Sequence, residues 1–185
     1  MGDTSWIVKT PEQIEERERK QKAHDKLVES CVFCNIAFRN DLRADILYKD
    51  SKYVVFRDIR PSAKEHYLVV TKKHIKNLKQ LSYDDIPMIE NMIDVAKATL
   101  VKNEADPDNA RIGFHLPPLV SVDHLHMHVI APADKIGFFG RLMFRPDSYW
   151  FLTVETFLEQ LRAKESEFWG SEKMMSNWYV EPYMR

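Results

Sequence analysis

Residues 124–130 alternate histidine with apolar residues, and this pattern constrains the fold more than any other stretch of the chain. The order is His124-Leu125-His126-Met127-His128-Val129-Ile130. Side chains of a β-strand point alternately to opposite faces of its sheet. The sequence therefore predicts a strand that packs its apolar face against a core and presents three imidazoles on the other face.

Three imidazoles in a row suggest chemistry, because imidazole can attack, donate a proton or accept one near neutral pH. In one interpretation the histidines bind a metal ion, since neutral imidazole is a common zinc ligand. In the other, one histidine is a covalent nucleophile toward phosphorus and its neighbours handle protons and phosphate oxygens. The third possibility is a strand face that is merely polar. The residues by themselves leave the two chemical interpretations open.

Other blocks of the chain bear on this choice. They are residues 31–36 (CVFCNI), 56–61 (FRDIRP), 66–75 (HYLVVTKKHI), 113–118 (GFHLPP) and 148–151 (SYWF). Together with the three histidines they resemble the histidine triad (HIT) superfamily of nucleotide hydrolases and transferases, in its Hint branch. The last two blocks look most like the third Hint-type paralogue. One departure is that many Hint proteins carry a Gly-rich segment with Asn and Gln before the triad, where this chain has residues 114–120 with two prolines.

The resemblance implies the catalytic residues. It makes His126 the nucleophile that attacks the α-phosphorus of a nucleotide, with His128 beside the phosphate and leaving group and His124 in a supporting role. The remaining histidines of the predicted sheet region are expected to serve packing or local hydrogen bonds: His66, His74 and His115.

The resemblance also implies the nucleotide-binding residues. Asp58 matches the family carboxylate that accepts hydrogen bonds from the ribose hydroxyls, and Ile59 lies beside it. Ser121 matches the family serine that bonds to the phosphate or leaving group. Phe33 and Ile36 are expected to form an apolar slot for a purine base.

The only two cysteines, Cys31 and Cys34, have two interpretations. Their spacing is half of a typical zinc site, which the resemblance would complete with His74 and His124. Alternatively, they are two small buried apolar side chains. The sequence does not decide, so no metal and no cofactor is assigned. With no further thiol available, the pair cannot form the framework of a secreted scaffold, and a reducing compartment is expected.

Short β-rich segments separated by turn residues dominate the middle of the chain. The predicted strands cover residues 46–48, 53–58, 67–71, 111–116 and 124–131. Ser82 and Asp85 resemble a capping box that starts an amphipathic helix, whose apolar residues recur at helical spacing up to Leu100. The predicted fold class is α+β, with a five-stranded, mainly antiparallel sheet packed by a central helix.

Both ends of the chain are predicted to extend this domain. Thr10 and Gln13 resemble a second capping box, which would start a highly charged helix over residues 11–28. A C-terminal helix is expected to begin near Thr153, followed by a Trp-rich tail. The expected division is a charged N-terminal extension (1–28), a HIT domain core (29–132) and a C-terminal extension (133–185) that packs on or near the domain.

The composition of the chain limits which classes of binding partner are expected. A chain of 185 residues with 44% hydrophobic content can bury one proper core. A formal net charge of −1 gives no global attraction to nucleic acid or to anionic lipid, so neither is an expected partner. No stretch has the 18 or more apolar residues of a membrane span. We expect a cytoplasmic protein, also present in the nucleus, that forms a homodimer or larger homo-oligomer as the resemblance implies.

The activity that the resemblance implies is an adenosine 5′-monophosphoramidase. Such an enzyme hydrolyses purine nucleoside phosphoramidates, and also aminoacyl adenylates, to AMP and an amine through a nucleotidyl-histidine intermediate. Two alternatives stay open: a nucleotide-binding regulatory adaptor, and a DNA deadenylase of the aprataxin type. A zinc hydrolase that uses the triad directly is the remaining possibility.

Overall fold

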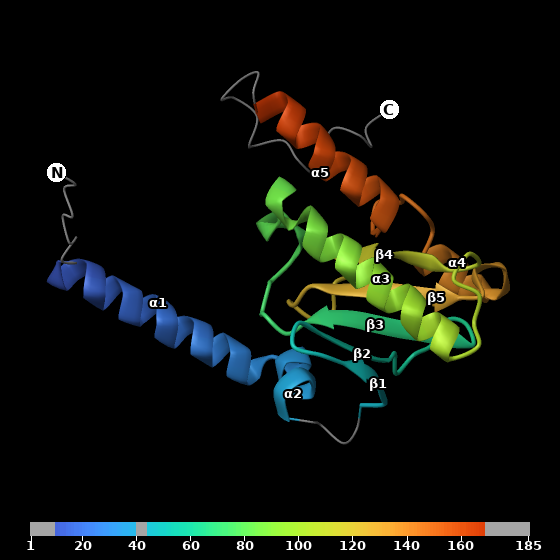
Figure 1. The fold of residues 1–185 in the computed structure, drawn as a ribbon, viewed down its shortest axis with the longest axis horizontal. Helices are drawn as coiled ribbons and strands as arrows, with labels where there is room; N and C mark the ends of the chain where they lie inside the picture. Colours follow the sequence, from blue (N-terminus) through green and yellow to red (C-terminus); the bar gives the residue numbers. More distant parts are fainter. Residues whose placement is uncertain (1–9, 40–43, 169–185) are drawn as a thin grey trace, which may run out of the picture.

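A computed structural model describes residues 10–39 and 44–168 of the chain. The Trp-rich tail lies outside the described residues. Apart from the extended helix at the start, the elements gather around one sheet (Figure 1).

The sheet has six antiparallel strands in the order β1-β2-β3-β5-β4-β6. The strands are β1 (Ile46–Lys49), β2 (Tyr53–Arg57), β3 (Glu65–Thr71), β4 (Arg111–His115), β5 (His126–Ala131) and β6 (Phe151–Thr153). The α+β class and the antiparallel sheet are confirmed, but the prediction of five strands is wrong. β6 is three residues long, too short for its alternation to be visible in the sequence, and it forms because it pairs with the edge of β4.

One face of the sheet carries the larger core, under α3 (Ile86–Lys102) and α5 (Val154–Phe168) (Figure 1). Ile89 and Met92 of α3 are fully buried there, as are Phe157 and Leu161 of α5. The capping box at Ser82 is confirmed, although a short 3-10 turn separates it from the start of α3. The described 3-10 helices are Leu78–Gln80, Tyr83–Asp85 and Ala133–Lys135.

Two short helices that the sequence analysis did not predict cover the ends of the opposite face. α2 (Val32–Arg39) packs its buried side chains on β2 and β3, forming one apolar cluster. α4 (Phe138–Met143) leads into Phe144, which joins a second cluster with Ile130 and Phe151. The strand positions between these two clusters are occupied by histidines of β3, β4 and β5.

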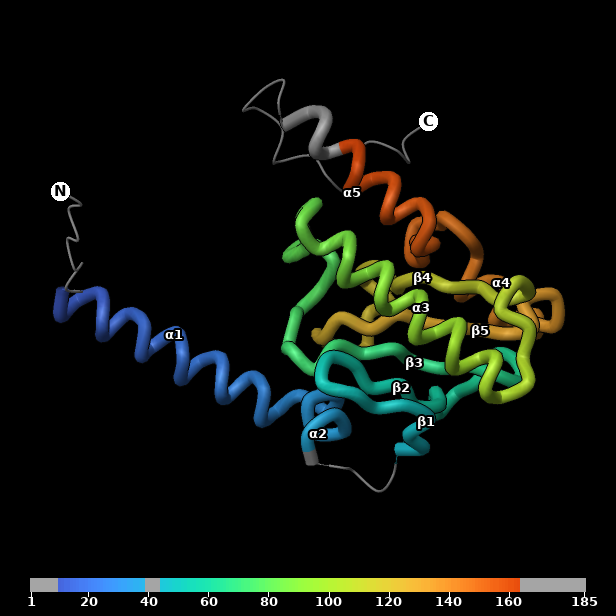
Figure 2. The backbone as a smooth tube through the Cα atoms, viewed as in Figure 1, coloured from blue at the N-terminus to red at the C-terminus, as the bar shows by residue number. Residues whose placement is uncertain are grey.

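α1 (Pro11–Ser30) runs away from the sheet and contacts the domain near its C-terminal end, where Val28 packs against the α2 cluster (Figure 2). The predicted capping box is present, because the Thr10 hydroxyl accepts from Gln13 N–H and the Gln13 side chain accepts from Thr10 N–H. None of its residues is buried, which agrees with the highly charged helix that the sequence predicted. No helix in the described part of the chain combines the length and apolar character that a membrane crossing requires.

Candidate active site

Two of the three triad histidines lie where the alternation predicted. His126 and His128 are opposite Val70 and Leu68 of β3 and share the face that bears α2 and α4. Met127 and Val129 point into the core under α3 and are fully buried. Because of this alternation, one face of β5 packs into the core and the other face carries the histidines.

The third histidine departs from the prediction, since β5 begins at His126 and His124 precedes it. The backbone bends there: the N–H of His124 donates to Val122 O at 2.8 Å, and the N–H of Leu125 donates to Ile75 O. The ring of His124 turns away from the strand row, and its Nε2–H donates to the carbonyl of Thr71 at 2.8 Å. The prediction of a strand from residue 124 is wrong because a turn bond to Val122 and a bond to Ile75 replace the strand ladder at that point.

His126 is held in one orientation and one tautomer. Its Nδ1–H donates to the carbonyl oxygen of His124 at 2.6 Å. The lone pair is therefore on Nε2, for which the described residues offer no hydrogen-bond donor. Burial lowers the pKa of His126, so the ring is neutral at pH 7. A neutral imidazole with a fixed, unprotonated nitrogen is the form that a nucleophile requires.

His128 has the opposite tautomer, and a chain of hydrogen bonds fixes it. The N–H of Ser62 donates to Nδ1 of His66 at 3.2 Å, which leaves the His66 proton on Nε2. That Nε2 lies 3.0 Å from Nδ1 of His128 and donates to it. The proton of His128 is therefore on its own Nε2, which is buried and has no partner among the described residues.

Burial keeps both of these rings neutral, lowering the pKa of His66 to about 4 and that of His128 well below its usual value. A buried N–H without a partner costs free energy unless a ligand accepts its proton. The arrangement therefore presents one nitrogen lone pair, on His126, and one N–H donor, on His128, from adjacent positions of the same face. Their rings are 5.2 Å apart.

His66 and His115 were expected to serve packing or local bonds, yet both contact the triad. The Nδ1–H of His115 donates to the carbonyl of Trp150 at 3.0 Å, and its ring lies 4.8 Å from that of His128. The Phe144 ring also packs against His128, with the two ring centroids 5.2 Å apart. The predicted strand began at Tyr67, two residues after the observed start of β3 at Glu65, so His66 was left outside it.

Of the predicted nucleotide-binding residues Asp58, Ile59 and Ser121, only Asp58 lies close to the triad histidines. Asp58 lies in the site, with Oδ2 at 3.6 Å from Nε2 of His66 and 4.0 Å from Nδ1 of His128. Ile59 follows it but is 88% exposed. Ser121 is exposed, and no hydrogen bond from it is described. The structure thus joins Asp58 to the triad and leaves Ser121 and Ile59 at the surface.

The predicted base slot has one clear point of contact with the triad. Phe33 of α2 is buried, and its ring meets that of His126 edge to face at 5.1 Å. Ile36 is buried one turn later in the same cluster. These two side chains form an apolar wall beside the nucleophile.

No candidate metal group in the described ranges contains more than one triad histidine. Ligand atoms of Asp58, His66 and His128 do lie close together. However, the facing nitrogens of the two imidazoles are already bonded to each other, so they do not offer two lone pairs to a cation. The geometry gives no support to a hydrolase in which the triad itself binds zinc.

A separate cluster fits a structural zinc ion well. The sulfurs of Cys31 and Cys34 and the Nδ1 atoms of His74 and His124 all lie within 4.8 Å of one another. Nδ1 of His124 is 3.4 Å from each sulfur, and Nδ1 of His74 is 3.3 Å from that of Cys34. Tetrahedral zinc with these ligands needs donor atoms about 3.5 Å apart. Because Nε2 of His124 carries the proton given to Thr71, the Nδ1 lone pair faces the sulfurs.

The electrostatics of the cluster also suit a cation. Burial, with Cys31 next to it, raises the pKa of the Cys34 thiol to about 12. A divalent cation reverses this shift by stabilising the thiolate. Of the two interpretations of the cysteine pair, the four-ligand site is the one that the side chains fit.

Comparisons with known proteins agree with this geometry. The family model described as "Scavenger mRNA decapping enzyme C-term binding" matches residues 30–144. The protein of Xenopus tropicalis named Adenosine 5'-monophosphoramidase HINT3 is 46% identical over 135 residues, which are 72% of this chain and 88% of that protein. The protein of the same name from Mus musculus is 45% identical, over 72% of this chain and 82% of its own length.

Solved structures give the same result. A HIT family hydrolase from Legionella pneumophila superimposes with a TM-score of 0.51 at 30% identity, over 55% of this chain and 92% of its own length. Relatives named aprataxin match less of the chain and at lower identity than the two proteins above. This chain therefore belongs to the histidine triad superfamily, in the Hint branch and alongside the third Hint-type paralogue.

Proposed function

We propose that this protein is an adenosine 5′-monophosphoramidase that hydrolyses the P–N bond of purine nucleoside phosphoramidates. The observation that carries the proposal is the pair of opposite tautomers, a free lone pair on His126 Nε2 beside an unpartnered N–H on His128 Nε2. One nitrogen can attack phosphorus while the other protonates the departing amine. The names of the relatives support the same reaction.

The first step would form a covalent intermediate. His126 Nε2 attacks the α-phosphorus, a new P–N bond forms to the histidine, and the bond to the substrate nitrogen breaks. The departing nitrogen takes the proton from His128 Nε2–H and leaves as a neutral amine. In the second step, His128 accepts a proton from water as the water oxygen attacks phosphorus. The bond to His126 then breaks, and AMP is released.

The remaining contacts would bind and orient the nucleotide. Asp58, next to His128, accepts hydrogen bonds from the ribose hydroxyls, and Phe33 beside His126 contacts the base. Since His126 and His128 lie one strand repeat apart, the α-phosphate has to lie over both rings. Ser121 and Ile59 remain proposed nucleotide contacts. Both are exposed, so each would contact the nucleotide only after it binds.

The direct test is intact-protein mass spectrometry after mixing with an adenosine phosphoramidate. We expect a transient, acid-labile gain of one adenylyl group, abolished in His126→Ala. Turnover without an adduct, or turnover unchanged in His126→Ala, would overturn the covalent mechanism. The same measurement with a 5′-adenylated oligonucleotide distinguishes the phosphoramidase from the deadenylase alternative. A deadenylase would turn over the oligonucleotide faster than the small phosphoramidate.

We also propose that two chains associate, as the resemblance to Hint proteins implies. Within the chain, β6 covers the edge of β4, so that edge is closed to a partner strand. The sheet edges are therefore β1, which pairs with β2 alone, and β6, which is three residues long and pairs with β4 alone. Analytical ultracentrifugation tests the association, and a monomer at micromolar concentration would contradict it.

A further inference from the structure

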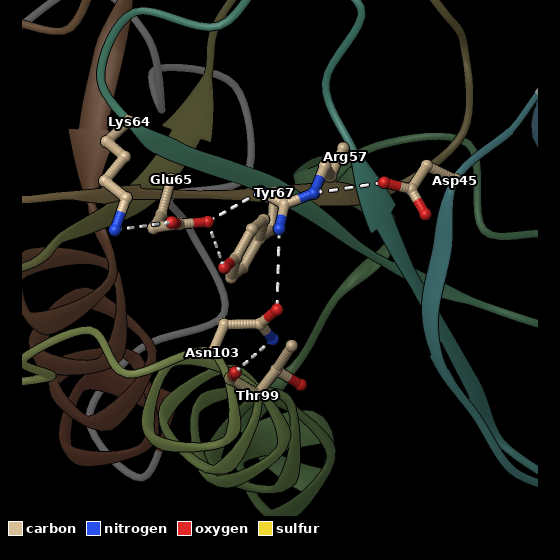
Figure 3. A network of polar contacts seen from close by, with 7 residues as sticks. All are labelled: Asp45, Arg57, Lys64, Glu65, Tyr67, Thr99 and Asn103. Carbon is tan, nitrogen blue, oxygen red and sulfur yellow. Dashed lines mark hydrogen bonds and ion pairs between the residues drawn. The ribbon is translucent and has the colours of Figure 1, made fainter.

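An ionic cluster around the buried carboxylate of Glu65 lies on the face of the sheet opposite to the histidines. Oε2 of Glu65 accepts hydrogen bonds from Arg57 Nη1 at 2.6 Å and from the Tyr67 hydroxyl at 2.5 Å (Figure 3). The Glu65 side chain is only 6% exposed. Although burial acts to raise its pKa, the bonds from Tyr67 and Arg57 lower it overall, so the carboxylate stays charged.

Arg57 connects this carboxylate to three other parts of the fold. Its Nε pairs with Asp45 Oδ2 at 3.0 Å, just before β1. Its Nη2 donates to Asn103 Oδ1 at 3.4 Å, and Asn103 in turn donates to the Thr99 carbonyl at the end of α3. The guanidinium lies over the Tyr67 ring at 5.3 Å (Figure 3). One planar, multidentate group therefore fixes where β1, β2, β3 and α3 meet.

The same backbone segments carry site residues on their other face. Asp58 follows Arg57, and His66 lies between Glu65 and Tyr67. The N–H of Asp58 donates to the carbonyl of His66 at 2.8 Å, so these two residues are a cross-strand pair. Because strand side chains alternate, a shift of β2 by one residue on β3 would turn Asp58 away from His128. It would also displace the connection between the two strands, whose Ser62 N–H bonds to Nδ1 of His66.

We infer that the Arg57–Glu65 pair is a positioning device for the active site, which fixes the register of β2 on β3 and so holds Asp58 toward His128 and the Ser62 N–H on His66. The inference rests on the proposed function, because it concerns the residues that would bind and protonate the nucleotide. The Glu65 carboxylate is buried, whereas the Arg57 side chain is 37% exposed. Such an ion pair adds little net stability, since desolvation of the carboxylate offsets the attraction, but its bonds favour a single arrangement. The pair should therefore matter more to the site than to the free energy of unfolding.

The test replaces the pair with apolar residues of similar size, in the double variant Arg57→Met/Glu65→Met. The matched control is Glu90→Met/Arg162→Met, which removes the 2.8 Å ion pair that joins α3 to α5 away from the site. We expect the first variant to unfold cooperatively near the wild-type temperature. For an adenosine phosphoramidate its KM should rise and its kcat fall, each by roughly tenfold, as is common when supporting bonds are lost.

A second measurement does not depend on turnover. Long-range ¹H–¹⁵N spectra report which nitrogen of each histidine carries the proton. In the double variant, His66 and His128 should lose their single tautomers, while His126 should keep the Nδ1–H form. A purely structural role of the pair would leave all of these tautomers unchanged in the folded protein.

If the double variant does not fold, Glu65→Gln and Arg57→Lys replace it. The first removes the charge and keeps the shape, and the second keeps the charge but loses the planar fork. Both should show the same change of tautomers to a smaller degree. Unchanged tautomers, KM and kcat in the folded variants would overturn the inference, as would equal losses in the control. A wild-type protein that does not turn over the phosphoramidate would instead overturn the proposed function.

Discussion

The carbonyl oxygen of His124 accepts the Nδ1–H of His126 at 2.6 Å, while the ring of His124 turns its Nδ1 toward Cys31 and Cys34. One residue therefore belongs to two centres. Its backbone sets the tautomer of the nucleophile, and its side chain completes the Cys₂His₂ cluster. The metal ligand and the attacking nitrogen lie on different residues, so the cluster can stabilise the site without taking part in the reaction.

This arrangement predicts the effect of metal removal. A strong chelator should lower the midpoint of thermal unfolding by about 5 °C or more. We expect metal removal to lower the free energy of unfolding by ~2 kcal/mol, and each kcal/mol lowers the midpoint of a domain of this size by about 2–4 °C. The adenylyl adduct on His126 should still form. The checks are calorimetry, elemental analysis and mass spectrometry, with Cys31→Ser/Cys34→Ser as the metal-free comparison. Immediate loss of the adduct on chelation would point to a metal hydrolase instead.

The bond between His66 and His128 predicts a dependence on the leaving group. His66→Phe removes the donor that keeps the proton on His128 Nε2. We expect kcat for an alkylamine phosphoramidate to fall by roughly 10–100-fold, since supporting bonds of this kind are commonly worth that much. A nucleotide ester with a nitrophenolate leaving group needs no proton and should be affected far less.

The control for that experiment is Glu90→Met/Arg162→Met, which removes an ion pair between α3 and α5 away from the site and should match the wild type with both substrates. Equal losses for both substrates in His66→Phe would contradict the assignment of His128 as the proton donor.

Burial of the histidines predicts how stability depends on pH. Burial lowers the pKa of His66 from 6.5 to about 4, so below pH 6.5 the unfolded chain takes up a proton that the folded chain does not. The free energy of unfolding should therefore fall as the pH drops from 6.5 to 4, by up to about 1.4 kcal/mol per pH unit for this residue. Above pH 6.5 this residue contributes no slope.

Urea unfolding at a series of pH values checks this. His66→Phe should show a shallower loss of the free energy of unfolding below pH 6.5 than the wild type. Burial lowers the pKa values of His126 and His128 as well, so part of the slope should persist in the variant. An identical slope in His66→Phe and the wild type would show that this ring is not buried in its neutral form.

Gly113 gives a prediction about the strand that the sequence analysis missed. A Cβ at this position would lie 2.3 Å from the Leu152 carbonyl oxygen and 2.7 Å from the Phe151 ring. Gly113→Ala should therefore displace β6 from β4 and lower the free energy of unfolding by about 2 kcal/mol, the usual size of an overpacking cost. Gly137→Ala is the control, because a Cβ there meets no atom within 4 Å. A stable Gly113→Ala protein would contradict the described packing of β6.

The sequence by itself determined the elements whose pattern is local. Alternation located β5 and its two faces, helical spacing located α3, and two capping boxes marked where helices start. The motifs identified the superfamily, which the comparisons confirmed. The roles given to individual site residues remain predictions, because they depend on a ligand.

Only the tertiary structure decided the relationships between distant segments. The pairing of β6 with β4, the bond from His66 to His128 across 62 residues and the meeting of Cys31 with His124 across 93 residues have no local signature. Tautomers in particular are set by which carbonyl or N–H a ring meets in the fold, and a sequence pattern does not specify that partner. The physical reason is that alternation fixes the face to which a side chain points, whereas packing of the whole chain fixes what it meets there.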